Sequence, residues 1–141
     1  MLKGIDPLLG PDLLHVLAAM GHGDEIVIAD ANFPADSHAE RLVRLESASA
    51  TRAAEAILSV LPLDEYVEVP AAVMSVVGDP DAEPEIFAEF RHIAESAHTA
   101  SVEFDRVDRF AFYERARQAY AIVATGERRL YGNLILVKGV L

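Results

Sequence analysis

Two spacings of apolar residues alternate along this chain. In one, apolar residues recur every three or four positions, which is typical of a helix with one buried face. In the other, apolar residues follow one another in short runs, which is typical of a buried strand. The first spacing predicts helices over residues 11–20, 51–61, 84–98 and 109–118. The second predicts strands over residues 25–30, 71–77, 101–105, 119–124 and 133–137, and the alternating segment 41–45 predicts one more.

Residues that start or stop regular structure stand at the ends of these segments. Pro11 lies where a missing backbone N–H does no harm to a helix, and Thr51 and Asp108 are of the types that cap helix N-termini. Gly21 follows the first predicted helix, as a C-terminal glycine often does. Pro34 interrupts residues 32–38, which we therefore expect to form a loop.

Helices and strands alternate from one end of the chain to the other, which favours an α/β fold with helices packed on a central sheet. The chain has 141 residues, enough for one compact domain with its own core. It shows no internal repeat, low-complexity tract or linker. We therefore expect residues 1–141 to form a single domain.

Composition narrows the classes of function. The chain has no cysteine, which excludes disulfides, thiol nucleophiles and cysteine-based metal sites. Its net charge of -11 disfavours nucleic acid and anionic membranes as partners. It shows neither a signal peptide nor about 18 consecutive apolar residues, so we expect a cytoplasmic protein. Hydrophobic residues make up 52%, and we expect part of this surface to be buried between subunits.

The segment Gly21-His22-Gly23-Asp24 precedes a predicted strand that ends at Asp30. Glycines on both sides leave the imidazole of His22 uncrowded, and histidine titrates near neutrality, so a proton-transfer site is one interpretation. The strand delivers Asp30 to a sheet edge, where ligands often bind, and its charge is expected to favour protonated His22. The alternative is that His22 is a polar turn residue beside a helix end.

Two later segments carry side chains suited to polar ligands. Arg109 opens a segment with three aromatic residues, and its guanidinium offers a fork of donors to hydroxyl or carboxylate groups. The aromatic residues alone are better explained as core. Tyr131 and Asn133 can donate and accept hydrogen bonds, and Gly132 between them allows a close approach of the backbone. The alternative for Tyr131–Asn133 is a turn with polar ends.

Other candidate chemistry is weakly supported. His38 lies near Asp30 in sequence, but no HExxH or HxH spacing supports a metal site, so we expect no metal. His92 and His98 are explained by partial exposure on a helix and by the dipole at a helix end. Neither a phosphate-binding glycine loop nor a G-x-S-x-G nucleophile motif occurs.

Several of these separated segments resemble one known family, that of D-ribose pyranase and L-fucose mutarotase. The similarity runs along nearly the whole chain, and residues 46–105 match in pattern only. Its most specific segments are Met20-Gly21-His22-Gly23-Asp24-Glu25-Ile26, Asp30 with Phe33-Pro34, Arg109-Phe110-Ala111-Phe112-Tyr113-Glu114-Arg115-Ala116, and Thr125-Gly126-Glu127-Arg128 with Tyr131-Gly132-Asn133. The segment 109–116 looks like the fucose branch of the family.

The resemblance implies a ring-forming α/β subunit, typically in a decamer, with active sites near subunit contacts. It implies that His22 is a catalytic acid and that Asp30, Arg109 and residues Tyr131, Gly132 and Asn133 bind a sugar. Tyr131 is a second, weaker candidate for proton transfer. No cofactor is implied.

The expected activity is therefore interconversion of the α and β anomers of a monosaccharide, L-fucose first. The alternatives are a D-ribose pyranase, a mutarotase for another sugar, a non-catalytic sugar-binding or transport-associated module, and a purely structural ring protein.

Overall fold

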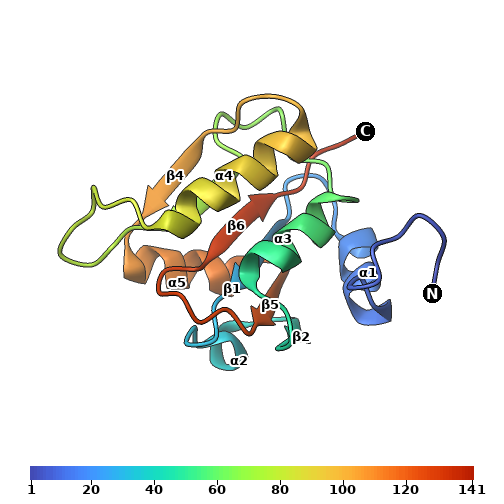
Figure 1. Ribbon diagram of the computed structural model, residues 1–141, viewed down its shortest axis with the longest axis horizontal. Helices are drawn as coiled ribbons and strands as arrows, with labels where there is room; N and C mark the ends of the chain where they lie inside the picture. Colours follow the sequence, from blue (N-terminus) through green and yellow to red (C-terminus); the bar gives the residue numbers. More distant parts are fainter.

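A six-stranded mixed sheet runs through the middle of the molecule, and helices cover both of its faces (Figure 1). The computed structural model describes residues 1–141. The elements in chain order are α1 (Pro11–Ala19), β1 (Glu25–Ala29), α2 (Ala35–His38), β2 (Leu42–Leu45), α3 (Ala50–Leu58), β3 (Ala71–Met74), α4 (Glu85–His98), β4 (Phe104–Val107), α5 (Arg109–Gln118), β5 (Ala121–Thr125) and β6 (Leu134–Val137). The expected α/β fold is confirmed.

The direction of the strands decides which residues can meet at the sheet edge. The strand order is β2-β5-β1-β6-β3-β4. β6 runs antiparallel to both of its neighbours, β1 and β3, while every other pairing is parallel. The carboxyl ends of the parallel strands therefore lie along one edge of the sheet, together with the amino end of β6.

Two hydrophobic cores lie on the two faces of the sheet. Successive side chains of a strand point to opposite faces. On β1, Ile26 and Ile28 belong to the core beneath α1, α3 and α4, and Val27 and Ala29 belong to the core beneath α2 and α5. Burial on both faces explains why β1 is a run of apolar residues with no alternation of apolar and polar positions.

Three predicted boundaries move because tertiary contacts decide them. Ser49, not Thr51, caps α3, since its hydroxyl accepts a hydrogen bond from the N–H of Arg52. The segment predicted as a loop around Pro34 contains the single-turn helix α2, which begins directly after that proline. The strand predicted over 101–105 lies at Phe104–Val107, where it pairs with β3.

The cap of α5 is as predicted. The Asp108 side chain accepts hydrogen bonds from the N–H groups of Phe110 and Ala111, and the helix covers Arg109–Gln118. The aromatic residues of α5 differ in burial: Phe112 is fully buried, Tyr113 is half-buried, and Phe110 is 71% exposed. Of the three residues predicted to lie in the core, only Phe112 is completely inside it.

We predict that Gly126→Ala destabilises the protein by about 2 kcal/mol or more, because an added Cβ would overlap the backbone carbonyl of Glu46 and that backbone cannot yield cheaply. Gly10→Ala is the matched control: nothing lies within 4 Å of an added Cβ there, and we expect a change of less than about 1 kcal/mol. Urea unfolding of the two variants measures both values, and equal losses would contradict the prediction.

Candidate functional site

A pocket of about 380 Å³ opens at the sheet edge where the parallel strands end. Its volume lies within the range of roughly 300–1,000 Å³ typical of small-molecule sites. The lining residues are Asp30, Asn32, Phe33, Met74, Val77, Arg109, Tyr113, Leu130, Tyr131 and Asn133. Four of the six residues singled out in the sequence thus share one pocket, although they come from three distant parts of the chain.

Asp30 and Asn133 form the buried floor of this edge. The Asn133 amide oxygen accepts from the Asp30 backbone N–H at 2.8 Å, and its Nδ2 donates to Asp30 Oδ2 at 2.9 Å. Asp30 Oδ1 accepts from the N–H of Asn32 at 2.9 Å. Burial raises the pKa of Asp30 above its ordinary value, and these hydrogen bonds oppose that rise.

Tyr131 projects from a strained backbone into the same pocket. Its φ of 62° is left-handed, a conformation that bulky residues rarely adopt. Its hydroxyl accepts a hydrogen bond from the N–H of Val77 at 3.1 Å. That contact fixes the hydroxyl at the pocket wall, where its own proton remains free to be donated.

Gly132 is buried and does not line the pocket. An added Cβ would lie 2.7 Å from Cγ of Glu127 and 3.1 Å from Cδ1 of Ile86. The glycine is therefore needed for packing inside the protein, and its expected contact with a sugar stays a prediction. Its backbone N–H acts with the other donors around Asp30 to lower the pKa of that carboxyl group.

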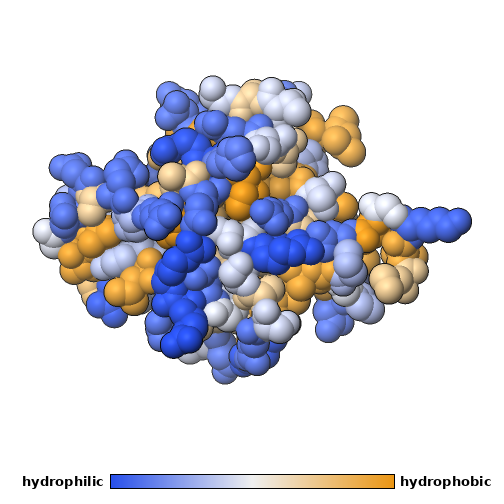
Figure 2. Space-filling model, viewed as in Figure 1, coloured by the Kyte–Doolittle hydropathy of each residue, from blue (hydrophilic) through white to orange (hydrophobic).

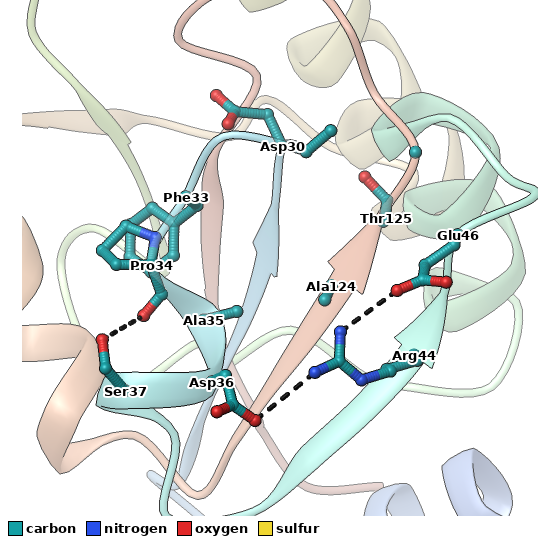
Figure 3. A pocket seen from close by; sticks show the side chains of 12 residues that line it. Asp30, Phe33, Pro34, Ala35, Asp36, Ser37, Arg44, Glu46, Ala124 and Thr125 are labelled. Carbon is teal, nitrogen blue, oxygen red and sulfur yellow. Dashed lines mark hydrogen bonds and ion pairs between the residues drawn. The ribbon is translucent and has the colours of Figure 1, made fainter.

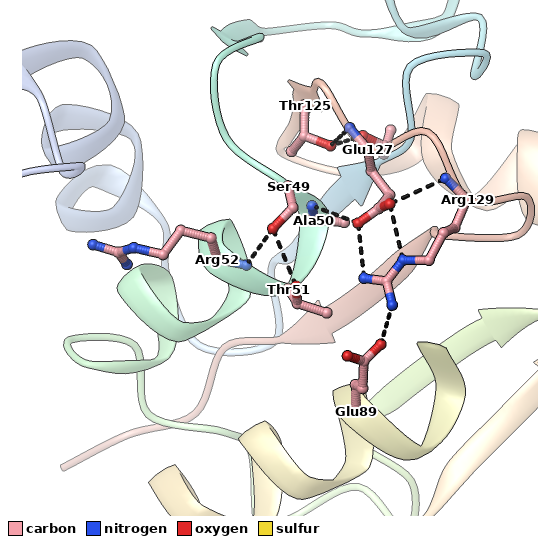
Figure 4. A network of polar contacts seen from close by, with 9 residues as sticks. Ser49, Ala50, Thr51, Arg52, Glu89, Thr125, Glu127 and Arg129 are labelled. Carbon is pink, nitrogen blue, oxygen red and sulfur yellow. Dashed lines mark hydrogen bonds and ion pairs between the residues drawn. The ribbon is translucent and has the colours of Figure 1, made fainter. Parts of the chain in front are cut away.

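The loop that carries Tyr131 is held by a buried carboxylate (Figure 4). Glu127 accepts from the Ala50 N–H at the start of α3 and from the backbone and guanidinium of Arg129. Arg129 also pairs with Glu89 of α4. Hydrogen bonds from Arg129 hold the pKa of Glu127 below its ordinary value despite burial. The loop is thus tied to two helices before it reaches the pocket.

Arg109 is an exposed cation at the pocket mouth. Its Nε donates to the Tyr113 hydroxyl at 3.1 Å, and its guanidinium carbon lies 5.4 Å and 5.5 Å from the ring centroids of Phe110 and Tyr113. No carboxylate lies within ion-pair distance of it. Its remaining N–H donors are therefore available to a ligand.

His22 lies at the other end of β1 from Asp30. The five residues of β1 separate them, a span of about 16 Å at the usual rise of a strand. Within one subunit, Asp30 therefore does not act on His22 as expected. The carboxylate beside the imidazole is Asp64, whose Oδ1 lies 2.9 Å from His22 Nε2. Nothing in the sequence singled out Asp64, because it follows a proline-broken helix and belongs to no motif.

A larger pocket, of about 530 Å³, lies next to the first, and Phe33 and Asp30 contribute to both (Figure 3). Its polar side chains are already paired: Arg44 lies between Asp36 and Glu46 and bonds to each. The side chain of Asp30 points away from this group. We therefore take the smaller pocket, with its unpaired Arg109, as the candidate site.

His38 is held by ordinary protein partners. His38 contacts the Ser37 hydroxyl at 2.9 Å and the Arg117 guanidinium at 3.1 Å. No group of three or more His, Asp or Glu side chains is arranged to hold a metal ion. No helix is both long and apolar enough to cross a bilayer.

The model of the RbsD / FucU transport protein family matches residues 3–141. The chain belongs to this family. The fucose mutarotase of Homo sapiens is 48% identical over 146 residues, covering 99% of this chain and 94% of that protein.

Two solved structures differ in how similar they are to this chain. The crystal structure of the fucose mutarotase from Streptococcus pneumoniae, in complex with L-fucose, matches with a TM-score of 0.93 and 45% identity over 99% of each chain. Bacillus subtilis RbsD, complexed with D-ribose, matches with a TM-score of 0.77 and 24% identity, covering 100% of this chain and 99% of that one. The second likeness shows the shared fold alone.

We predict that Asn133→Ala lowers the free energy of unfolding by about 2–4 kcal/mol at neutral pH, because it removes the hydrogen bonds that Asn133 makes to two buried groups of Asp30, the backbone N–H and Oδ2. The lost donor served the charged carboxylate, so the loss should shrink as pH falls through the raised pKa of Asp30. Asn32→Ala is the control, since Asn32 contacts Asp30 only through its backbone. Unfolding measured across acidic and neutral pH tests both points; a loss that grows toward acid would contradict the assignment.

Proposed function

We propose that residues 1–141 form a sugar mutarotase domain that interconverts the α and β anomers of L-fucose. The observation that carries this proposal is the convergence of Asp30, Arg109, Tyr131 and Asn133 on one pocket. The relatives named fucose mutarotase support it, and so does the relative whose structure holds L-fucose. The 24% identity to the ribose-complexed relative makes a pyranase the second choice.

Mutarotation requires proton transfer at two oxygens and no redox step. A base removes the proton of the anomeric hydroxyl while an acid protonates the ring oxygen, and the bond between the anomeric carbon and the ring oxygen breaks. The open aldehyde turns its other face and recloses with the roles reversed. Acid–base groups of this kind contribute about 10²–10⁴ in rate, and no atom is gained or lost.

The pocket residues divide these tasks by their chemistry. Asp30 and Asn133 offer acceptors and donors to ring hydroxyls at the buried end, and Arg109 offers donors at the exposed end. The Tyr131 hydroxyl, already accepting from Val77, is placed to exchange a proton with the anomeric hydroxyl. His22 supplies the acid for the ring oxygen.

His22 can reach such a sugar only from a second copy of the chain, since β1 separates it from the pocket of its own subunit. We therefore place the active site between two subunits of a ring-shaped oligomer, a decamer by the resemblance. Two exposed apolar surfaces support this arrangement. Tyr66, 78% exposed, packs against the ring of His22, and exposed Val67 follows it in the chain. Val77 and Leu130 line the pocket, and exposed Phe110 lies beside Arg109 at its mouth.

The space-filling view is consistent with contacts between copies. Figure 2 shows hydrophobic atoms at the surface on the side where the loop after β3 and helix α5 lie in Figure 1, and again near both chain ends. Apolar patches of this kind commonly mark interaction sites. Their presence on a chain of net charge -11 is explained if neighbouring subunits cover them.

We predict that the protein accelerates exchange between the two anomers of L-fucose, and that His22→Ala reduces the rate by about 100-fold or more because the proton donor is lost. Saturation-transfer NMR on the anomeric protons measures this exchange directly. His92→Ala, on the exposed face of α4, is the matched control and should keep the wild-type rate.

Comparison of L-fucose with D-ribose, galactose and rhamnose in the same assay distinguishes the branches of the family. Fastest exchange of ribose would replace the fucose assignment by a pyranase. Sugar binding without any acceleration would favour a non-catalytic binding module, and absence of both would leave a structural protein.

We predict that two inactive variants restore each other when they assemble together. His22→Ala keeps an intact pocket and Arg109→Ala keeps an intact histidine, so sites formed between the two kinds of subunit regain both groups. Random assembly at equal amounts restores about a quarter of the sites. Co-expression with two affinity tags, followed by the anomer-exchange assay, tests this; activity no higher than that of the separate variants would place the complete site within one subunit.

A further inference from the structure

The imidazole of His22 is held by a carboxylate that is itself firmly anchored. Asp64 Oδ1 lies 2.9 Å from His22 Nε2, and the two carboxylate oxygens also accept from the N–H groups of Tyr66 and Val67, each at 3.2 Å. Only 2% of the Asp64 side chain is exposed, against 46% of the His22 side chain. A buried acceptor thus faces one ring nitrogen, while the rest of the ring faces outward.

Both partners of this contact are fixed to the end of β6. The Asp64 N–H donates to the Val137 carbonyl at 3.0 Å, and the Gly23 N–H donates to the Lys138 carbonyl at 2.8 Å. Gly23 has a φ of 85°, which lets the turn that carries His22 fold back toward this strand. The two side chains are therefore brought together by backbone hydrogen bonds to consecutive residues, independently of any ligand.

We propose that Asp64 is the positioning residue of His22: it holds Nε2 as the protonated nitrogen directed into the protein and leaves Nδ1 as the nitrogen that acts on the sugar. The inference rests on the proposed function, because it assigns the atom through which His22 would work. An ionised carboxylate only accepts hydrogen bonds, so the nitrogen facing it must donate. In the neutral ring the other nitrogen is then the acceptor.

The ionisation of Asp64 agrees with this reading. Burial alone would raise the pKa of Asp64, but hydrogen bonds from His22 and from the backbone N–H groups of Tyr66 and Val67 hold it below its ordinary value. The group is therefore a carboxylate at neutral pH and an acceptor for every partner it has.

Nδ1 of His22 is free of protein partners, since the only hydrogen bond of the ring is the one to Asp64. The ring of Tyr66 packs edge-on at 5.3 Å between centroids and limits rotation of the imidazole. When the ring is protonated, Nδ1 donates toward the ring oxygen of the sugar; when it is neutral, Nδ1 accepts the proton back. One nitrogen thus serves both directions of mutarotation without a flip of the ring.

The test is Asp64→Asn, which keeps the shape but lets the amide donate as well as accept. We expect kcat for L-fucose anomer exchange to fall by about 10- to 100-fold, with KM within about twofold because no sugar contact is removed. In ¹⁵N NMR of the histidine ring at alkaline pH, wild-type His22 should carry its proton on Nε2, and the variant should show part or all of it on Nδ1.

Two further variants separate positioning from general damage. In a His22→Ala background, Asp64→Asn should cause no additional loss, because Asp64 acts only through the imidazole. Glu65→Gln changes the exposed neighbouring carboxylate and should leave both exchange and ring tautomer as in the wild type.

The outcomes distinguish this inference from the proposed function. Active wild type with an equally active Asp64→Asn variant would overturn the positioning role and leave the mutarotase assignment standing. A wild-type His22 protonated on Nδ1 would overturn it whatever the activity, and does not require the variant to fold. If the wild type exchanges no anomers, the proposed function fails. An Nε2 tautomer found in that case would show only that Asp64 orients the ring, without a role in catalysis.

Discussion

The reciprocal hydrogen bonds between Asp30 and Asn133 are the contact on which the pocket depends. They join the end of β1 to the start of β6, and they are possible only because β6 runs antiparallel to β1. A parallel β6 would place Asn133 at the opposite edge of the sheet, and Tyr131 with it. The direction of one strand therefore decides which side chains can surround a ligand.

The surroundings of two buried carboxylates near this edge shift their pKa values in opposite directions. Glu127 has a guanidinium and backbone donors around it, and its pKa is lowered, so it supports the loop as a fixed anion. Asp30 has only neutral donors, and burial raises its pKa. A buried carboxylate with only neutral donors is more costly to keep charged than one beside a guanidinium, which is why the two pKa values move apart.

The proposed chemistry divides between the two ends of β1. The pocket end holds binding groups and one hydroxyl, and the other end holds the histidine with its carboxylate partner. Each half is held by hydrogen bonds within one chain: Asn133 to Asp30 at the pocket end, and backbone bonds to the end of β6 at the other. The apolar surfaces beside both halves give a physical reason for the proposed association, namely removal of exposed side chains such as Phe110 and Tyr66 from water.

Elements whose causes are local can be predicted from the order of the residues alone. The apolar runs predicted β1, β5 and β6, and Asp108 predicted the start of α5, because burial on both faces and helix capping act over a few residues. The family resemblance, now confirmed by the match to residues 3–141, brought Asp30, Arg109, Tyr131 and Asn133 into one hypothesis. The structure then placed these four in one pocket.

The position of His22 and its contacts depend on how distant segments pack. Its partner Asp64 is 42 residues away, and its contact depends on hydrogen bonds to the end of β6 that no local spacing encodes. The shift of the strand near residue 104 and the packing role of Gly132 have the same origin, since a pairing partner and a filled space are properties of the folded chain. The spacing of apolar residues shows which face of a helix or strand is buried. Which other segment packs against that face is known only from the folded structure.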